Sequence, residues 1–130
     1  MILLNTHVVA WLAFDAGRLS GRANSAIDKA RKGGEALAIC DITLLESTAL
    51  VSKGRIRLDI SLESFLREVE ARFVVLPITD RACALALALP ANYPKDPADR
   101  IIGATALAEG LSLLTADREI RRAKALSTIW

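Results

Sequence analysis

The sequence predicts an α/β fold in which helices cover both faces of a central parallel sheet of four or five short strands. Short apolar runs bounded by turn or capping residues alternate with longer segments of helical periodicity, as in parallel strands joined by crossover helices. The chain has 130 residues, of which 52% are hydrophobic, so it can bury a core as a single domain. We therefore expect one three-layer α/β/α domain over residues 1–130, without internal repeats or linkers.

The strands are expected where the apolar runs are shortest. These runs lack polar alternation, so we expect the strands to be covered on both faces. A last and weaker candidate lies near Ser127–Trp130. The other expected strands are Ile2–Leu4, Ala38–Cys40, Val74–Leu76 and Ser112–Leu114.

The helices are expected from apolar spacing and capping residues. Between Leu19 and Ala30, apolar residues recur at helical spacing opposite basic side chains, which predicts an amphipathic helix that ends at Gly33. A long helix begins at Pro97, because proline fits the first helical position and the preceding Asp96 is a good N-cap. Further helices are expected over Thr43–Ser52, Ser61–Arg72 and Thr79–Leu89, the last one stopped by Pro90.

Charge and cysteine content exclude little. The net charge of +2 neither requires nor excludes a nucleic-acid partner, and we interpret the basic stretches as solvated helix faces. Cys40 and Cys83 lie inside apolar runs without the spacing of a metal or redox motif, so we expect buried, reduced thiols. No apolar stretch is long enough to span a bilayer and no signal-peptide pattern is present, so we expect a cytoplasmic protein without a membrane partner. The basic stretches are Arg18–Lys32, Lys53–Arg57 and Arg118–Lys124.

Acidic or amide side chains follow successive expected strands. Asn5 follows the first strand, Asp41 and Glu46 follow the second, and Asp117 follows the fourth, while Asp99 lies in the first turn of the long helix. The carboxyl ends of parallel strands share one edge of a sheet, so these side chains are expected to converge on one crevice.

Each of these residues also has a structural interpretation. Asn5, Asp96 and Asp117 fit helix N-caps, and Thr43–Glu46 fits a capping box. As a group, however, carboxylates within a few ångströms repel one another and must take up protons or bind cations. Mg²⁺ prefers such hard oxygen ligands, and one or two ions can drive phosphodiester hydrolysis. The group therefore predicts a metal site.

Three segments resemble the PIN-domain ribonuclease toxins of the VapC type, in matching order. They are Met1-Ile2-Leu3-Leu4-Asn5-Thr6-His7-Val8, Asp96-Pro97-Ala98-Asp99-Arg100-Ile101-Ile102-Gly103-Ala104-Thr105-Ala106 and Leu113-Leu114-Thr115-Ala116-Asp117. The resemblance spans essentially the whole chain. It implies a metal-dependent endoribonuclease that uses Mg²⁺, or Mn²⁺ in its place. Its acidic quartet maps onto Asn5, Glu46, Asp99 and Asp117, with Asp96 and Thr115 as helpers and Asp41 as an alternative to Glu46.

One position departs from the family pattern, because the family has Asp where this chain has Asn5. An amide oxygen can bind Mg²⁺ but carries no net charge, so the site loses part of its hold on the cation. Two explanations fit: a deliberate substitution that lets a toxic nuclease be produced, which we favour, and a naturally weakened family member. Either way, the chain with Asn5 is expected to be a disabled enzyme.

The resemblance also implies partners and a substrate. The native form is expected to cleave structured RNA, above all tRNA, to pair as a homodimer, and to be silenced by a cognate antitoxin lying along a groove. The expected antitoxin contacts are Val8–Phe14, Ile60, Leu62 and Phe65. The alternative is an RNA- or antitoxin-binding module without catalysis. A DNA nuclease would need additional clamping helices, and a phospho-acceptor receiver would need acids that Asn5-Thr6 and Pro77-Ile78 lack.

The other polar and aromatic residues carry less weight. His7 is expected to point to another face of its helix than Asn5. Trp11 and Trp130 have rings that can stack on bases, but we interpret both as core or interface packing. No Gly-x-Ser-x-Gly elbow and no glycine-rich phosphate loop occurs, so covalent hydrolase and nucleotide-binding chemistry are unsupported.

Overall fold

The computed structural model describes all 130 residues and has one five-stranded sheet in the order β3-β2-β1-β4-β5. All four strand pairs are parallel, so the predicted parallel sheet is confirmed with its fifth strand. The chain winds outward from β1 to β3 and then crosses back to the other side of β1, so the winding reverses between β1 and β4. The strands are β1 Ile2–Leu4, β2 Leu37–Cys40, β3 Val74–Leu76, β4 Leu113–Leu114 and β5 Thr128–Ile129.

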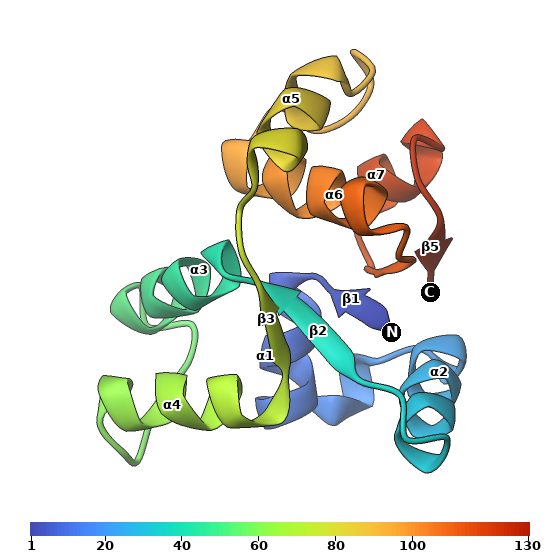
Figure 1. The fold of residues 1–130 in the computed structure, drawn as a ribbon. Coiled ribbons are helices and arrows are strands. Elements are labelled where there is room, and N and C mark those ends of the chain that lie inside the picture. The colour runs from blue at the N-terminus through green and yellow to red at the C-terminus, as the bar shows by residue number, and fades with distance from the viewer.

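Helices lie on both faces of the sheet and complete the predicted three layers (Figure 1). One layer holds α1, α2 and α4, the opposite layer holds α5, α6 and α7, and α3 follows β2 at the carboxyl edge. None of these helices combines the length and the hydrophobicity needed to cross a membrane. The helices are α1 Thr6–Phe14, α2 Gly21–Lys32, α3 Ile42–Ser52, α4 Leu62–Arg72, α5 Asp80–Ala88, α6 Pro97–Glu109 and α7 Arg118–Ala123, with a short 3₁₀ turn at Ala16–Arg18.

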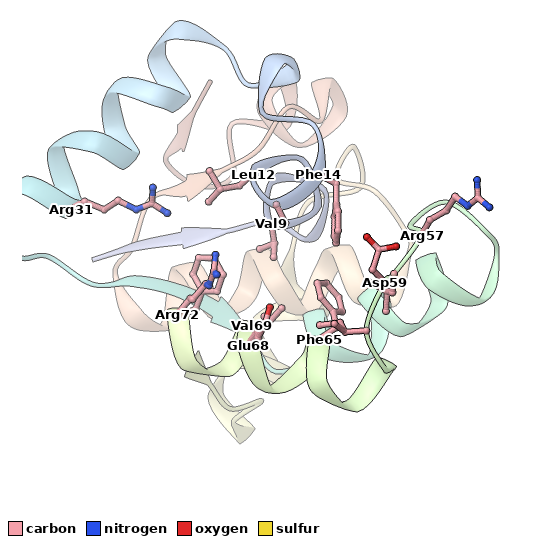
Figure 2. Close-up of a pocket in the computed structure, with 14 residues that line it drawn as sticks. Val9, Leu12, Phe14, Arg31, Arg57, Asp59, Phe65, Glu68, Val69 and Arg72 are labelled. Carbon is pink, nitrogen blue, oxygen red and sulfur yellow. The ribbon is translucent and has the colours of Figure 1, made fainter.

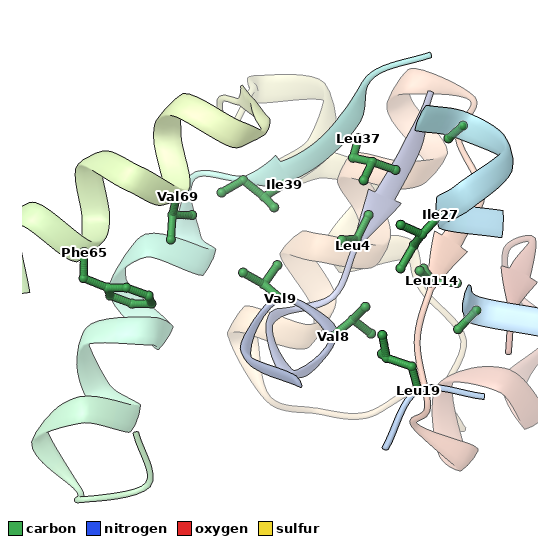
Figure 3. Close-up of a cluster of buried hydrophobic side chains, with 12 residues drawn as sticks. Leu4, Val8, Val9, Leu19, Ile27, Leu37, Ile39, Phe65, Val69 and Leu114 are labelled. Carbon is green, nitrogen blue, oxygen red and sulfur yellow. The ribbon is translucent and has the colours of Figure 1, made fainter. Parts of the chain in front are cut away.

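Each face of the sheet has its own hydrophobic core. Successive strand side chains point to opposite faces, so Leu4 packs toward α1 and α2 while Leu3 packs toward α6. Figure 3 shows the first of these cores, in which Phe65 and Val69 of α4 approach the sheet. The expectation that every strand is covered on both faces is wrong for β3. Val74 is 39% exposed, because β3 is at the edge of the sheet.

Two further expectations need correction. The capping box at Thr43–Glu46 does not form, because α3 begins before Thr43 and Asp41, at the N-cap, makes no side-chain capping bond. The carboxylate of Asp41 instead accepts a hydrogen bond from the N–H of Ile78 (3.3 Å), beyond β3. Cys40 is buried as expected, but Cys83 is exposed, because it lies on the outer side of α5.

Candidate active site

Polar residues distant in sequence meet at the carboxyl ends of β1 and β4, where the winding of the sheet reverses. The register pairs Leu4 with Leu114, and the N–H of Asn5 donates to the carbonyl of Leu114 (3.0 Å). Asn5 and Thr115 therefore leave the sheet side by side. Such a reversal point is where open parallel sheets form crevices for ligands.

Asn5 is held at both ends of its side-chain amide. Its Oδ1 accepts a hydrogen bond from the N–H of Thr6 (2.8 Å), which caps α1, and its Nδ2 donates to Oγ1 of Thr115 (3.1 Å). Exchanging the two amide atoms would place a donor against the Thr6 N–H, so this orientation is the one that the contacts allow. The side chain is 3% exposed. A second lone pair of Oδ1 is the part of this residue that can serve as a ligand.

Thr115 connects position 5 with Asp117. Its hydroxyl oxygen accepts from Asn5 and also from the backbone N–H of Asp117 (3.1 Å). Asp117 in turn caps α7, where its Oδ1 accepts from the N–H of Ile120 (3.1 Å). The structure thus places Thr115 between two of the residues that the resemblance implies as catalytic.

Glu46 projects from α3 toward the start of α1. The hydroxyl of Thr6 donates a short hydrogen bond to Oε1 of Glu46, and the hydroxyl of Thr43 lies 3.1 Å from the same Thr6 oxygen. Burial raises the pKa of Glu46, with the Thr6 bond opposing this shift and the charge of Asp96 adding to it. Glu46 therefore faces the crevice, whereas Asp41, the alternative at this position, is turned toward the loop after β3.

Asp99 is the most strongly perturbed acid of the site. Its pKa is raised to about 7, first by burial and then by the negative charges of neighbouring acids. None of these acids forms a salt bridge, because the two ion pairs of the chain join Met1 to Glu35 and Arg67 to Glu63. No lysine or arginine therefore forms an ion pair with the acids of this edge. The neighbouring acids are Asp96, Glu46, Asp117 and Glu119.

The first turn of α6 is fixed by packing as well as by its cap. Asp96 caps the helix through a bond from the N–H of Ala98 (3.4 Å). The buried Tyr93 donates its hydroxyl to the carbonyl of Asp99 (3.0 Å) and lies against Gly103. Burial, followed by the charges of Asp99 and Asp117, raises the pKa of Tyr93 above its ordinary value, so this hydroxyl keeps its proton.

A pocket of about 230 Å³ lies between these elements. Asp96 and Asp117 do not line it, although both influence the pKa of Asp99. No three histidine, cysteine, aspartate or glutamate side chains lie close enough together to form a metal-binding group of their own. An ion held here would take most of its ligands from water and phosphate oxygens, as Mg²⁺ commonly does. The pocket is lined by Asn5, Thr6, His7, Glu46, Ala49, Leu50, Lys53 and Asp99.

The expectation that His7 points away from the site is wrong, because His7 lines this pocket. Its Nε2 accepts a hydrogen bond from the N–H of Ala116 (2.9 Å), which draws the ring toward the loop after β4. Burial lowers its pKa to about 4, with Asp117 opposing the shift and Arg18 adding to it. The imidazole is therefore neutral at pH 7, and its acceptor nitrogen is already used. Lys53, which sequence reasoning missed as a pocket residue, lies at the C-terminus of α3.

A second and larger hollow, of about 570 Å³, separates α1 from α4 (Figure 2). Val9, Leu12 and Phe14 of α1 face Phe65 and Val69 of α4 across it, and the rings of Phe14 and Phe65 lie 5.6 Å apart. We call this hollow the α1–α4 groove. Its charged residues are Arg31, Arg57, Asp59, Glu68 and Arg72.

The expected antitoxin contacts fall on the α1–α4 groove in part. Ile60 and Phe65 line it, and so does the outer side of the segment Val8–Phe14. Val8 itself lies in the core, and Leu62 packs against that core instead of lining the groove. The side of α1 that faces away from the core thus forms one wall of the α1–α4 groove.

Comparison with known proteins agrees with this architecture. The PIN domain family model matches residues 2–126. Ribonuclease VapC22 of Mycobacterium tuberculosis is 38% identical over 120 residues, covering 92% of this chain and 89% of that protein. Two solved structures share the fold: VapBC2 from Rickettsia felis bound to a promoter DNA fragment, and DNA-bound VapBC from Salmonella typhimurium.

The likeness to these two structures extends over nearly their full length. The Rickettsia felis structure has a TM-score of 0.75 at 20% identity, over 98% of this chain and 97% of that chain. The Salmonella typhimurium structure has a TM-score of 0.69 at 22% identity, again over 98% and 97%. The matched family model and the likeness to these solved structures thus agree on the fold. The chain therefore belongs to the PIN-domain family and, within it, to the VapC-type ribonucleases.

Proposed function

We propose that this chain is the toxin of a toxin–antitoxin pair, a divalent-metal-dependent endoribonuclease that cleaves structured RNA, above all tRNA. The observation that carries the proposal is the pocket lined by Glu46 and Asp99, which we call the acidic pocket, in which burial and neighbouring charges raise the pKa of Asp99 to about 7. A divalent cation would relieve the repulsion between these acids, and it would also bind phosphate oxygens of the substrate. The similarity to a protein named a ribonuclease supports RNA as the substrate.

The residues of the pocket have distinct tasks in this proposal. When bound, Mg²⁺ or Mn²⁺ supplies an activated water and stabilises the oxygens of the phosphodiester displacement. Oxygen atoms of five residues would hold it, directly or through water. Thr6 orients Glu46 through its hydroxyl, and Thr115 does the same for position 5. The five residues are Asn5, Glu46, Asp96, Asp99 and Asp117.

Asn5 is the reason to expect a weakened enzyme. An Asp at position 5 would restore one negative charge in the pocket that Asp99 lines. Its carboxylate would accept a hydrogen bond from the Thr115 hydroxyl, whereas the Asn5 amide donates a hydrogen bond to that hydroxyl. We predict that Asn5→Asp raises Mg²⁺-dependent cleavage of a mixed tRNA pool at least about ten-fold, equivalent to about 1.4 kcal/mol of barrier. The measurement compares both proteins free of antitoxin, with and without EDTA.

The double variant Asn5→Asp with Asp99→Asn is the matched control and should return cleavage to the background. Cleavage that persists in EDTA would contradict metal dependence. If the Asn5→Asp variant stays inert while RNA still binds, the alternative of a binding module without catalysis holds. That alternative draws on one observation, that both the oxygen and the nitrogen of the Asn5 amide already make hydrogen bonds within the protein.

The antitoxin is proposed to occupy the α1–α4 groove. The floor of the groove is apolar, and its rim carries three arginines against two acids, so it suits a segment with apolar side chains flanked by acidic ones. The solved structures of VapBC complexes support a protein partner for this fold.

Charge placed in the groove should weaken antitoxin binding. Phe14 is 50% exposed at the mouth of the groove, and we predict that Phe14→Glu lowers affinity for the antitoxin about ten-fold or more, because a carboxylate would be buried without a partner. Phe65→Glu should act in the same direction. Ala71→Glu adds the same charge to the exposed side of α4, outside the groove. Affinity for the antitoxin is measured by calorimetric titration. If Phe14→Glu and Ala71→Glu bind the antitoxin with equal affinity, the groove is not part of the interface.

A homodimer is the third part of the proposal. Two large apolar side chains are left in solvent on two different helices, Leu45 of α3 (65% exposed) and Leu87 of α5 (89% exposed). Burying such side chains against a second copy would remove apolar surface from water.

A further inference from the structure

Three aromatic side chains and one arginine lie together beside the acidic pocket, and we call them the aromatic cluster. The ring centroids of His7 and Trp11 lie 4.9 Å apart, those of Trp11 and Trp130 lie 5.9 Å apart, and those of His7 and Trp130 lie 6.5 Å apart. The guanidinium of Arg18 lies over the Trp11 ring, 4.1 Å from its centroid. Residues from α1, from the turn that follows it and from the position directly after β5 thus lie together.

The aromatic cluster is continuous with the acidic pocket. His7 belongs to both, since it lines the pocket together with Asp99 and contacts both tryptophans. Trp130 directly follows Ile129, whose carbonyl accepts a hydrogen bond from the N–H of Thr115 (3.2 Å). The cluster therefore lies at the same carboxyl edge of the sheet as the acids.

Core packing buries only part of the surface of these side chains. Trp11 and Trp130 contact the core on the α1 side, as the sequence led us to expect, but both remain partly exposed. Arg18 is exposed and forms no salt bridge. A guanidinium stacked on an indole beside a pocket for phosphate offers both a flat surface and a positive charge to a ligand.

We propose that this aromatic cluster is a base-stacking subsite for single-stranded RNA, which holds a nucleotide adjacent to the phosphate bound in the acidic pocket. Unpaired bases stack on aromatic rings and on arginine planes, and the Arg18 charge suits the RNA backbone. The inference rests on the proposed ribonuclease function and deepens it. It also revises the interpretation of Trp11 and Trp130 as packing residues alone.

The test uses the fact that the chain contains two tryptophans, both in the cluster. Intrinsic tryptophan fluorescence therefore reports on this subsite without any label. The protein with Asn5 is titrated in EDTA, to prevent cleavage, with a single-stranded RNA of about ten nucleotides. A second titration uses an abasic strand of the same length and charge. Quenching by the RNA and little or none by the abasic strand is the expected result.

Variants separate stacking from charge. Trp130→Leu should weaken RNA binding about ten-fold, whereas Trp130→Phe, which keeps a ring, should retain most of the affinity. Neither change should alter binding of the abasic strand. Arg18→Ala should weaken binding of both strands, and Arg22→Ala, an exposed arginine outside the cluster, serves as its control.

The outcomes distinguish the subsite from the enzyme. If Asn5→Asp cleaves RNA but RNA causes no base-dependent quenching and Trp130→Leu binds as before, the subsite is refuted and the ribonuclease stands. Base-dependent quenching without any cleavage supports the subsite on an RNA-binding protein. If neither strand binds and Asn5→Asp cleaves no RNA in Mg²⁺, both proposals fail.

Discussion

At the level of single residues, a hydroxyl decides how the site responds to position 5. Thr115 accepts hydrogen bonds from both Asn5 and Asp117, so its own proton is directed elsewhere. A carboxylate at position 5 would reverse the first bond, because it can only accept at pH 7. The same amide-to-acid change therefore alters charge and hydrogen-bond direction together, and the buried position accommodates either side chain without a change of shape.

The raised pKa of Asp99 makes stability depend on pH. A carboxyl whose folded pKa is about 7, against an ordinary 3.8, binds a proton more tightly in the folded state. Its stabilising contribution is full below the unfolded pKa and is lost as pH rises through about 7. We predict that, in EDTA, the protein gains stability relative to Asp99→Asn as pH falls from about 8 to about 6, by no more than about 1 kcal/mol after solvent screening.

Urea unfolding of the two proteins at each pH measures this difference. The comparison with Asp99→Asn cancels the contribution of His7, whose lowered pKa acts in the opposite direction: its stability is lost as pH falls below about 6.5 toward about 4. Added Mg²⁺ should remove the gain, because a bound cation favours the ionised carboxylate. A stability difference that does not change with pH would show that Asp99 is ionised throughout.

At the level of elements, α6 is seated by the fit of Tyr93 against Gly103. A Cβ at Gly103 would lie 2.2 Å from the Tyr93 hydroxyl oxygen and 2.8 Å from Cζ, so no side chain fits there without movement of the ring. Tyr93 also holds the carbonyl of Asp99, and Arg100 donates to the carbonyls of Ala86 and Tyr93 (3.2 and 3.4 Å). The position of Asp99 in the pocket therefore depends on packing one turn further along the helix.

Substitution at this contact should destabilise the fold. We predict that Gly103→Ala lowers the free energy of unfolding by about 1–3 kcal/mol, because the added methyl overpacks a buried contact. Gly21→Ala is the control, since a Cβ at Gly21 meets no atom within 4 Å, and it should be neutral or stabilising by up to about 1 kcal/mol. Equal urea midpoints for the two variants would mean that the tyrosine ring moves aside at no cost.

At the level of the whole molecule, surfaces on different elements are available for different partners. The acidic pocket opens at the carboxyl edge of the sheet, and the α1–α4 groove lies between helices of one layer. The exposed Leu45 and Leu87 belong to neither of these hollows. RNA, antitoxin and a second copy can therefore be tested by separate substitutions.

The proposed homodimer should depend on the exposed leucines. We predict that Leu87→Asp, or Leu45→Asp, shifts the protein toward monomer in sedimentation velocity, because a carboxylate in the interface loses its hydration. Glu70→Lys, an exposed charge change on α4, should leave the sedimentation coefficient unchanged. A protein that sediments as a dimer with both leucines replaced would place the interface elsewhere.

The layered α/β architecture, the order of strands and helices and the polar positions at the strand ends all follow from the amino-acid sequence. Apolar periodicity and capping are local properties, and residues such as Pro97 and Gly33 mark helix ends wherever the helix packs. The helix limits predicted for Thr79–Leu89 and Ser61–Arg72 differ from the observed ones mainly because their first residues act as caps.

Which polar side chains meet depends instead on tertiary packing. Glu46 faces the pocket and Asp41 does not, because Asp41 finds a backbone donor beyond β3. His7 turns toward the site because the loop after β4 offers it an N–H, and Cys83 is exposed because of the side of α5 on which it lies. Each of these outcomes depends on contacts between segments far apart in the chain. Local sequence patterns carry no information about such contacts, because only packing of the sheet brings these distant segments together at its edge.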